Sequence, residues 1–592
     1  MVDFFLFALV ATWSAYYNGI WDCDESMNYF EPFHQLLFGY GLQTWEYRCV
    51  LRFPSLCFCC LCSNPLFCVC TSPYLSPMYA LRSYFYLLVH TVGAYIPVAL
   101  DALQLFPLTK IGVFYGIRLF LGLVCAVCNT HLLRTVQLKY GNDTGQLLQL
   151  FLVVTPGMFI SSTAFLPSTF AMLCYSAMLA CWMRGQLVAA LYLVSLAACV
   201  GWPFSLLVGL PLALHILFKR GILFAIGHGL LSLVLFLGPS VAVDTHFYHK
   251  LVIAPLQIVL YNVFGHAGPE LYGVEPWYYY LLNGFLNFNF VLPLALVAPL
   301  ILLLWGWKSA RWSATRETLL YLSGGFLWLA YMSYIPHKEE RFLFVIYPWI
   351  CVAAALTLST ITKLFANWEK LVGTSVAFLL LFIVALSVAR NGAMYINYEA
   401  PISVYTHLYS IEDKGERVSL FSHPLQSIHS QFAFSNMEMD DAALEEDAKQ
   451  FTYVCVGREW YRFSTHFFLP PHLRLGFLRD EFHGQLPQYY SSGPDATWRI
   501  PEHFNDLNRE EETRYIDPDR CTYWVHFFED GQSYHQFKDT NTTWEVAYHA
   551  PFLSASLSKN AIARAFYIPT YSEENNVYGH YTLLRRRQPQ SQ

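Results

Sequence analysis

The sequence predicts a mainly helical protein that crosses a membrane many times and ends in a water-exposed α+β domain. The composition carries the first half of this prediction, because 55% of the 592 residues are hydrophobic and only 13% are charged. That charged fraction is about half that of an average soluble protein. The distribution of charge carries the second half: residues 84–390 contain long apolar stretches, whereas 400–592 is rich in charged residues and histidines.

The membrane part begins with residues 1–20, which we expect to form the first transmembrane helix. The apolar run ends at Tyr17 and is short for a span of about 20 residues, which leaves room for a start upstream of Met1. It has neither the basic start nor the cleavage site of a signal peptide. Further apolar segments, with 187–217 counted as one span or two, predict about 11–13 spans in total. They lie near 84–105, 111–133, 147–165, 168–183, 187–217, 222–242, 290–306, 318–335, 345–362 and 372–390.

Short basic connectors set the expected orientation of these helices. They hold Lys219 and Arg220, then Lys308, Arg311 and Arg316, then Lys363 and Lys370. Cytoplasmic loops carry an excess of lysine and arginine, so we expect all three connectors on the cytosolic side. The spans around them then place residues 243–288, 336–341 and 391–592 on the opposite, lumenal side.

Residues 391–592 predict a compact lumenal domain of α+β type. FTYVCVG and CTYWVHFF have the composition of strands, and Pro- and Asp-rich turns separate such runs. Asn541 opens a glycosylation sequon there, while a second sequon at Asn142 adjoins a span and is expected to go unused. The formal net charge of −6 offers no basic footprint for a nucleic acid.

A cluster of carboxylates follows the first helix. Asp22, Asp24 and Glu25 fall within four consecutive residues. Like charges at this spacing repel, so at least one carboxyl tends to hold its proton longer and can act as a base near neutral pH. Taken alone, the cluster is better explained as a solvated loop with acids at a helix start, and the sequence around it decides the matter.

The segment DCDESMNYFEPFHQLLFGYGLQTWEY resembles the opening lumenal loop of glycosyltransferase family 22, the dolichyl-phosphate-mannose-dependent mannosyltransferases. Within that family it is most similar to the alpha-1,2-mannosyltransferases of lipid-linked oligosaccharide assembly for N-glycosylation. Other stretches fit the same group: SPMYALRSYFYLLVH, SSTAFLPSTFAM, LVIAPLQIVLYNVFGHAGPELYGVEPWYYYLLNGFLNFN, HKEERFLFVIYP, VCVGREWYRFSTHFFLP and CTYWVHF. The resemblance therefore covers almost the whole chain.

The resemblance implies a GT-C membrane fold and an inverting transfer of mannose in the lumen of the endoplasmic reticulum. The implied donor is dolichyl-phosphate-mannose, and the implied acceptors are the dolichyl-diphosphate oligosaccharides Man6GlcNAc2 and Man8GlcNAc2. Inversion needs one carboxylate to take the acceptor proton. Asp24 is the candidate base, Glu25 is its alternative or orienting partner, and Asp22 tunes the local charge or bonds to acceptor hydroxyls. No cofactor is expected, and the partners are these two lipids and the surrounding membrane.

The leaving lipid phosphate needs positive charge, and cationic side chains can supply it in place of a metal ion. We expect His337, Lys338 and Arg341 of the HKEERF motif to bind it, with Arg82 as a further candidate. If the motif is helical, His337 and Arg341 share a face. The alternative is that Lys338 and Arg341 are snorkelling flanks of a span. Histidine spacing does not predict a zinc site, and no metal is expected.

Polar and aromatic residues of the expected lumenal loops are candidates for binding the acceptor sugars. They are Asn28, Glu31, His34, Gln43, Trp45, Glu46, Glu270, Glu275, Trp277 and Asn283. Aromatic residues at a membrane interface are common for other reasons. Two other functions stay open: a different family-22 enzyme of the alpha-1,6 branch or of glycosylphosphatidylinositol assembly, and a polytopic transporter or scaffold. A transporter would place polar groups within broken spans, whereas these spans are mostly Leu, Val and Phe.

A cysteine-rich segment interrupts the expected catalytic loop, residues 21–83. In the family pattern QTWEY runs directly into SPxYAxRSY, but here residues 48–75 separate the two halves and contribute seven of the sixteen cysteines. The run CFCCLC lacks the paired spacing of a zinc site. We expect a retained intron or mispredicted exon rather than a genuine insertion, and sequencing the transcript across Tyr47–Ser76 tests this.

Overall fold

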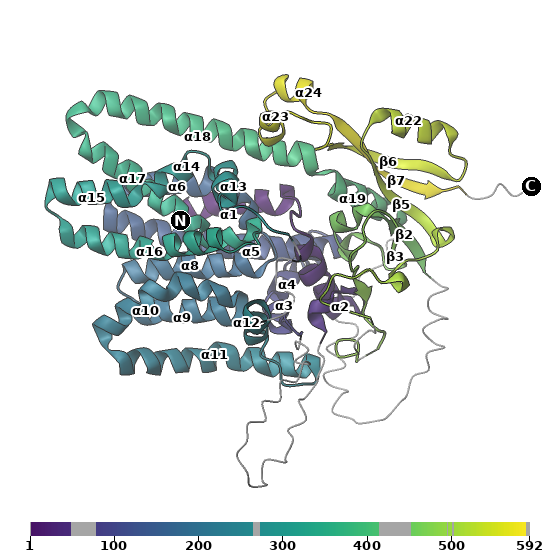
Figure 1. The fold of residues 1–592 in the computed structure, drawn as a ribbon, viewed down its shortest axis with the longest axis horizontal. Helices are drawn as coiled ribbons and strands as arrows, with labels where there is room; N and C mark the ends of the chain where they lie inside the picture. Colours follow the sequence, from purple (N-terminus) through teal and green to yellow (C-terminus); the bar gives the residue numbers. More distant parts are fainter. Residues whose placement is uncertain are drawn as a thin grey trace, which may run out of the picture.

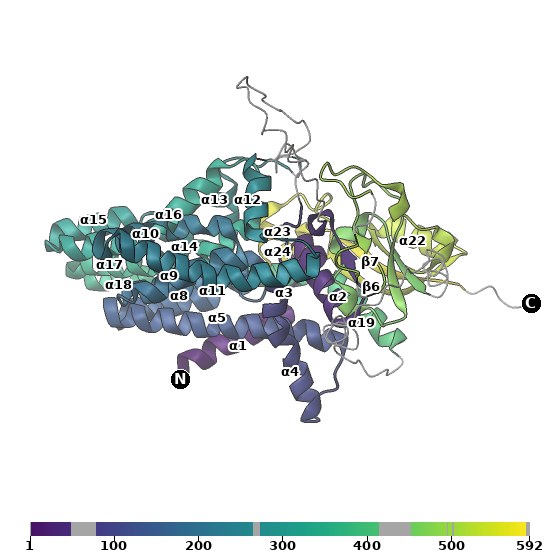
Figure 2. The same ribbon diagram turned by 90° about the horizontal axis from the view of Figure 1, so that it is seen from below.

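The computed structural model describes residues 2–48, 79–264, 271, 273–413, 451–493, 495–499 and 503–587. It has two parts, a helical body formed by the residues up to 413 and a sheet domain formed by those from 451 onward. In Figure 1 the helices of the body lie along the horizontal axis and the sheet domain caps their right-hand end, and Figure 2 shows the same order from below. The predicted fold class, a mainly helical membrane protein with a C-terminal sheet domain, is confirmed.

Proline and glycine mark several ends of the body helices. Pro156, Pro167 and Pro348 lie in the first turns of α7, α8 and α17, where a helix needs no N–H donor. The helices are α1 (Val2–Tyr17), α3 (Tyr84–Val89), α4 (Thr91–Ala102), α5 (Lys110–Tyr140), α6 (Asn142–Val154), α7 (Pro156–Ser161), α8 (Pro167–Met183), α9 (Leu187–Leu196), α10 (Leu206–Arg220), α11 (Ile222–Tyr248), α12 (Ala254–Phe264), α13 (Tyr279–Phe288), α14 (Val291–Leu296), α15 (Ala298–Ser309), α16 (Trp312–Tyr334), α17 (Tyr347–Leu364), α18 (Glu369–Tyr398) and α19 (Ala400–Glu412).

Burial separates a central helix from a lipid-facing rim. α17 is buried along most of its length, whereas α11 and α18 bury few residues and expose large apolar side chains such as Leu230, Val234 and Phe378. Exposed apolar surface of this kind suits hydrocarbon surroundings. Within the described ranges, six helices are long and apolar enough to cross a membrane, and four shorter apolar helices accompany them.

This number differs from the predicted 11–13 because several apolar segments are interrupted. Residues 187–217 form two helices, since Pro203 forces Trp202 into an extended conformation between α9 with its π-helical end η3 (Ala197–Gly201) and α10. Residues 290–306 likewise divide into α14 and α15. The expected loop 243–288 is corrected too, because α11 continues to Tyr248 and α12 and α13 follow.

The two ends of the helical body have different character. The turns α10–α11, α15–α16 and α17–α18, which carry the three basic connectors, lie at the end opposite the sheet domain (Figure 1). Lys139 at the end of α5 pairs with Glu317 near the start of α16 at 3.0 Å, at that same end. The loop after α1 lies at the other end, against the sheet domain. The three basic connectors therefore lie at the same end of the helical body, as expected if they are on one side of the membrane.

The sheet domain contains a five-stranded mixed sheet in the order β3-β2-β5-β7-β6. β2 pairs in parallel with β3 and β5, and β7 runs antiparallel to both β5 and β6. The strands are β2 (Thr452–Val456), β3 (Leu473–Phe477), β5 (Cys521–Phe528), β6 (Trp544–Leu553) and β7 (Tyr578–Arg586), and the helices are α22 (Gly531–Thr540), α23 (Ala561–Ala565) and α24 (Tyr571–Asn575). A disulfide joins Cys455 to Cys521 across β2 and β5. The two strands expected from FTYVCVG and CTYWVHFF are present, while the boundary at 391 falls inside α18.

The predicted cysteine-rich insertion lies outside the described residues, apart from Arg48. The described chain on either side of it comes together, because Ala80 N donates to Arg48 O at 2.8 Å and Leu81 N donates to Glu46 O at 2.9 Å. The described residues on the two sides of the insertion are therefore neighbours in the fold.

Candidate active site

The loop after α1 is itself folded. Asp24 caps a π-helical turn, η1 (Glu25–Phe30), which continues directly into α2 (Glu31–Phe38). π-Helical turns are frequent at functional sites. After α2, β1 (Leu42–Gln43) pairs antiparallel with β4 (Gln488–Tyr489) of the sheet domain, and η2 (Trp45–Tyr47) follows. The first loop, expected to be a catalytic loop, is thus an ordered helical segment held by the sheet domain.

Glu31 is a buried link between this segment and the sheet domain. Its carboxylate accepts hydrogen bonds from Thr465 Oγ1 at 2.8 Å, from the His466 backbone nitrogen at 2.7 Å and from His466 Nδ1 at 2.6 Å. Leu42 N is a fourth donor, at 3.0 Å. Burial opposes the charge, but these donors hold the pKa of Glu31 below its usual value, and burial lowers the pKa of His466. An ionised carboxylate therefore faces a neutral ring.

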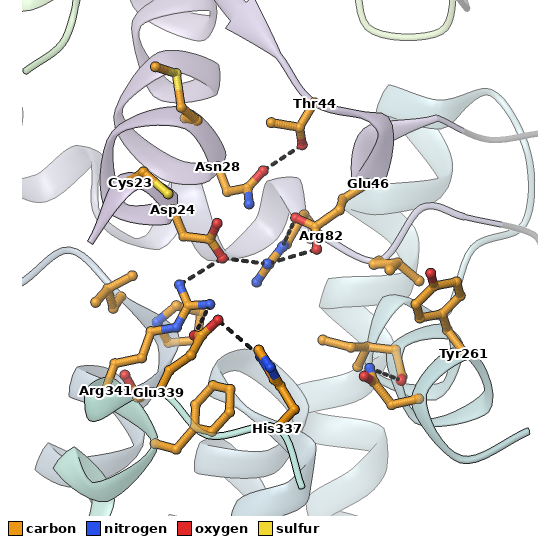
Figure 3. A pocket seen from close by; sticks show the side chains of 18 of the residues that line it. Cys23, Asp24, Asn28, Thr44, Glu46, Arg82, Tyr261, His337, Glu339 and Arg341 are labelled. Atoms are coloured by element: carbon orange, nitrogen blue, oxygen red, sulfur yellow. Dashed lines mark hydrogen bonds and ion pairs between the residues drawn. The ribbon is translucent and has the colours of Figure 1, made fainter. Parts of the chain in front are cut away.

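Two arginines converge on Asp24 (Figure 3). Arg82 donates from Nη2 to Asp24 Oδ2 at 3.0 Å, and Arg341, from η6 (Glu340–Ile346), reaches the same oxygen at 2.7 Å. Glu46 holds Arg82 through two hydrogen bonds of 2.8 and 2.9 Å, and Tyr29 accepts a third at 2.5 Å. One carboxylate oxygen thus lies between two cations that come from distant parts of the chain.

Arg341 also connects Asp24 to the rest of the HKEERF motif. Its Nη1 lies 3.1 Å from Asp22 Oδ1, and its Nη2 pairs with Glu339. Glu339 in turn holds His337 Nε2 at 3.1 Å. Residues 337–339 form no helix, and Glu339 is extended, so the condition for a shared helical face is not met. His337 and Arg341 meet through Glu339 instead.

The protonation of these groups follows from burial and the two arginines. Burial raises the pKa of Asp22 to about 7, against the opposing effect of Arg341. Burial also acts on Asp24, but Arg341 and Arg82 outweigh it and its pKa lies below the usual value. The pKa of His337 is raised, because hydrogen bonds to Glu339 and to the Gly273 carbonyl overcome burial. Asp24 is therefore ionised at neutral pH, while Asp22 is close to its midpoint.

Asp24, Arg82, His337, Glu339 and Arg341 form part of the lining of a cavity of about 680 Å³. This volume is within the size range of ligand sites. One further part of the lining is mainly apolar and comes from the helical body: Trp202, Phe204, Ile258, Val263, Tyr331, Met332, Ile335 and Phe342. Another part comes from the sheet domain: Trp460, Phe482, Gln485, Leu486, Pro487 and Asn508. The charged centre thus shares one cavity with an apolar surface and with an aromatic and polar surface.

Seven of the residues singled out from the sequence line this cavity. They are Asp24, Asn28, Trp45, Glu46, Arg82, His337 and Arg341. Asp22 does not line it but contacts Arg341. Asn28 accepts a hydrogen bond from Thr44 at 2.5 Å, and Trp45 packs edge-on against Tyr79.

Other predicted residues lie elsewhere. Glu25 is 2% exposed and accepts from the Phe165 backbone at 2.9 Å, so it does not reach the cavity. Lys338 points its ammonium at the carbonyls of Glu275, Ile335 and Pro336. Glu31, His34 and Gln43 are buried, Glu275 and Trp277 are exposed outside the cavity, Asn283 donates to Glu340, and Glu270 lies outside the described residues.

Sequence reasoning missed Glu339 and Tyr29 as members of the site. Glu339 stands inside the HKEERF motif, so the motif itself was the available signal. Asp22, Cys23 and Asp24 could also offer three metal-ligand atoms within 4.8 Å of one another. Arg341, however, already pairs with both aspartates, and acidic clusters of this kind are common without a metal.

Comparisons with known proteins agree on one family. The model of the Alg9-like mannosyltransferase family matches residues 2–78 and 71–470. Alpha-1,2-mannosyltransferase ALG9 of Mus musculus is 37% identical over 97% of this chain and 87% of its own length. The Drosophila melanogaster protein of that name is 34% identical over 97% and 85%, and the Saccharomyces cerevisiae protein is 29% identical over 93% and 88%.

Solved structures resemble the fold more remotely. ArnT from Cupriavidus metallidurans bound to undecaprenyl phosphate has a TM-score of 0.43 and 13% identity, with 79% of this chain and 86% of that chain covered. The Archaeoglobus fulgidus oligosaccharyltransferase AglB has a TM-score of 0.41 and 11% identity, over 78% and 62%. Both TM-scores are below 0.5, so the assignment rests on the family match and the relatives.

The helical membrane body, the charged cavity and these relatives define a membrane-bound glycosyltransferase. The chain belongs to the Alg9-like mannosyltransferase family. It is accordingly an enzyme that transfers mannose, and the transporter or scaffold reading is set aside.

Proposed function

We propose that the enzyme transfers mannose from dolichyl-phosphate-mannose, with inversion and in alpha-1,2 linkage, onto lipid-linked Man6GlcNAc2 and Man8GlcNAc2. The observation that carries the proposal is one carboxylate, Asp24, held between Arg82 and Arg341 in a cavity with an apolar wall. The alpha-1,2 linkage is supported by the names of relatives that cover 97% of the chain. By contrast, a GPI mannosyltransferase 3 of Trypanosoma brucei brucei matches only 24% of it.

The charges in the cavity suit a lipid-phosphate donor. Arginine binds phosphate oxygens through paired N–H donors, and Arg82 and Arg341 bring such donors to one place. His337, whose pKa is raised, can add a proton or a hydrogen bond to the leaving phosphate. The apolar wall around Phe204 and Ile258 gives the lipid chain a path that avoids water.

Asp24 is positioned to take the proton of the acceptor hydroxyl. Both arginines hold the same oxygen, Oδ2, and a donor phosphate competes for their N–H groups. As the arginines turn to the phosphate, the pKa of Asp24 rises from its lowered value and the carboxylate becomes a stronger base. Donor binding and base strength are thereby coupled, which favours transfer only when both substrates are present.

A location in the endoplasmic reticulum with the sheet domain in the lumen fits two features of that domain. The Cys455–Cys521 disulfide forms in oxidising compartments and is rare in the cytosol. The sequon at Asn541 is used only on the lumenal side. The arginine pair supplies the cation that the reaction needs, so no metal ion or cofactor is part of the proposal.

The direct test is transfer by the purified enzyme. Dolichyl-phosphate-mannose is supplied with lipid-linked Man6GlcNAc2 or Man8GlcNAc2, with and without a chelator, and the product linkage is determined. We expect one alpha-1,2-mannose on each acceptor and equal rates in the chelator. A product with alpha-1,6 linkage, or transfer to neither acceptor, contradicts the proposal, and loss of activity in the chelator contradicts its metal-free form.

Asp24→Asn tests the base. The amide cannot accept the acceptor proton, so we expect turnover to fall by about 10²–10⁴-fold with donor binding retained. Glu25→Gln is the matched control, because Glu25 does not line the cavity. It should keep most of the activity once its effect on stability is taken into account. An Asp24→Asn enzyme with normal turnover rules out this role.

A further inference from the structure

A second cavity, of about 390 Å³, lies where α1 meets the junction of the helical body and the sheet domain. Its lining comes from α1 and the turn after it, from α5, α18 and α19, and from β6. It shares no lining residue with the first cavity. Its size falls in the range of small-ligand sites, and the proposed reaction gives it no part.

Aromatic rings form much of this second cavity. Three ring pairs each join two different segments of the chain at centroid distances of 5.4–5.8 Å, namely Tyr16–Tyr115, Tyr17–Tyr395 and Trp21–Tyr398. An ordinary interfacial belt points such rings outward, at the level of the lipid headgroups. Here rings from separate elements line one cavity that is open to the surface, and Tyr16, Trp21 and Tyr395 keep 61%, 39% and 42% of their surface exposed.

The polar groups of the second cavity are largely unused. Within the described part of the chain, the hydroxyls of five lining tyrosines make no hydrogen bond to protein, and three of these side chains, Tyr16, Tyr17 and Tyr395, are exposed; the other two are Tyr115 and Tyr398. Glu399 is the carboxylate of the lining and accepts from Ser403 at 2.6 Å. Neither lysine nor arginine is among the lining residues. His407 also lines it, with its ring stacked on Tyr548. The cavity therefore offers ring faces, hydroxyls, an imidazole and one carboxylate.

This chemistry selects a neutral, hydroxyl-rich ligand. Sugar C–H faces pack on aromatic rings, and sugar hydroxyls bond to carboxylate and phenol oxygens. A phosphate or diphosphate finds no cation here and is repelled by Glu399. A quaternary ammonium headgroup also attracts aromatic rings, but the ammonium itself has no hydroxyl groups to exchange hydrogen bonds with the phenol and carboxylate oxygens. A carbohydrate uses both features.

The position of the second cavity relates it to the reaction. Trp21 in its lining directly precedes Asp22, which contacts Arg341 at 3.1 Å. Trp21 and Asp24 are three positions apart in the sequence, so their Cα atoms lie at most about 11 Å apart. The two cavities therefore lie near each other along this segment, and acceptor binding at both requires that a branched glycan with its reacting hydroxyl at Asp24 place another branch in the second cavity.

We infer that the second cavity binds neutral hexose units of the acceptor glycan, away from the reacting hydroxyl, and so contributes to acceptor specificity. The inference rests on the proposed function, since it takes the acceptor to be a branched mannose oligosaccharide. It names a site at which the enzyme distinguishes a full acceptor from a shorter one.

The test compares two lipid-linked acceptors that share the reacting branch, one complete and one without the mannoses of the other branch. The variants are Tyr398→Ala, which removes a ring, and Glu399→Gln, which keeps the shape and removes the charge. Tyr334→Ala is the matched control, because Tyr334 is 85% exposed and lines neither cavity. KM and kcat are measured in the full-length purified enzyme, and the apparent Tm confirms folding.

We expect each cavity variant to raise KM for the complete acceptor about tenfold, as for the loss of one good contact. KM for the short acceptor, KM for the donor and kcat should stay at the wild-type values. Equal changes for both acceptors, or no change, overturn the inference while wild-type transfer still supports the proposed function. An effect that depends on phosphatidylcholine in the bilayer and not on the acceptor also overturns it, in favour of a lipid headgroup.

Discussion

At the scale of single residues, the structure separates two cations that look alike in the HKEERF motif. Arg341 reaches Asp24, Asp22 and Glu339 inside the first cavity. Lys338, three residues before it, donates hydrogen bonds from its ammonium group to backbone carbonyls, among them Glu275 O at 2.8 Å. The motif alone cannot distinguish them, because the direction of each side chain depends on the non-helical backbone at 337–339.

This difference predicts that alanine substitutions of Arg341 and Lys338 have different effects on KM for the donor. Arg341→Ala removes a charged donor to the phosphate, worth about 1.5–3 kcal/mol, so KM for the donor should rise about 10–100-fold. Lys338→Ala should leave KM for the donor unchanged, and any loss should appear in the apparent Tm. Steady-state kinetics with varied dolichyl-phosphate-mannose measure both. Equal donor KM values in the two variants would mean that Arg341 only flanks a span.

Asp22 makes stability depend on pH. The folded protein holds the Asp22 proton up to about pH 7 because burial raises its pKa, whereas an unfolded chain loses it near pH 4. Between these values the folded state binds more protons, so this group lowers stability as the pH rises from about 4 to 7. Asp22→Asn removes that dependence. The apparent Tm of the variant relative to wild type should therefore increase across this window.

Comparing the two proteins at each pH cancels the contributions of the other titrating groups. The apparent Tm is measured in the same detergent for wild type and Asp22→Asn at several values from pH 4.5 to 8. Two curves that run parallel would show that Asp22 is ionised throughout in the folded protein. A variant that gains stability at acid pH would reverse the sign and refute the raised pKa.

At the scale of elements, the contact between α2 and the sheet domain depends on Glu31. Glu31→Ala leaves Thr465, His466 and Leu42 N without their acceptor. Leaving a buried donor without an acceptor costs about 1–3 kcal/mol, and several donors lose theirs here, so the apparent Tm should fall strongly. Glu545→Ala breaks the exposed pair with Arg585, which is worth about 0–1 kcal/mol. Similar losses in both variants would show that Glu31 does not hold the two parts together.

The sequence predicted the elements better than their contacts. Apolar length located the helical body, and strand composition located β2 and β5. It placed Asp24, Arg82 and Arg341 in one site, because the family resemblance ties those motifs together. It assigned Glu31 and His34 to sugar binding, yet both are buried. The partner of Glu31 is His466, 435 residues away, and no local pattern reports a contact of that range. The disulfide between Cys455 and Cys521 was missed for the same reason.

At the scale of the whole molecule, the active centre lies at the end that carries the sheet domain, and the basic turns lie at the other end (Figure 1). The first loop and the sheet domain must therefore be on one side of the membrane. The positive-inside rule predicts that this side is the lumen. Two glycosylation sequons, one at each end, allow this orientation to be tested without altering the active site.

Asn541 should carry a glycan, and Asn142 should not. Asn541 follows the last residue of α22 in the sheet domain. Its Oδ1 accepts hydrogen bonds from Thr543 N and Trp544 N. Its Nδ2, the nitrogen that is glycosylated, takes no part in these two hydrogen bonds. Asn541 is half-buried and Asn142 is exposed. Asn142 begins α6 beside Tyr140, whose hydroxyl contacts Thr318 near the start of α16, at the end with the basic turns. Accessibility alone would allow both sites, so only orientation separates them.

The measurement is the mass of the protein from a eukaryotic expression host, before and after removal of N-glycans. Thr543→Ala should abolish the shift, and Thr144→Ala, which destroys the other sequon, should leave it unchanged. Thr144 is buried and donates to Ser359 at 2.8 Å, so Asn142→Gln serves as a milder second variant. A glycan on Asn142 would place the basic turns in the lumen. Because Asp24 lies at the opposite end, the proposed lumenal reaction would then be wrong as well.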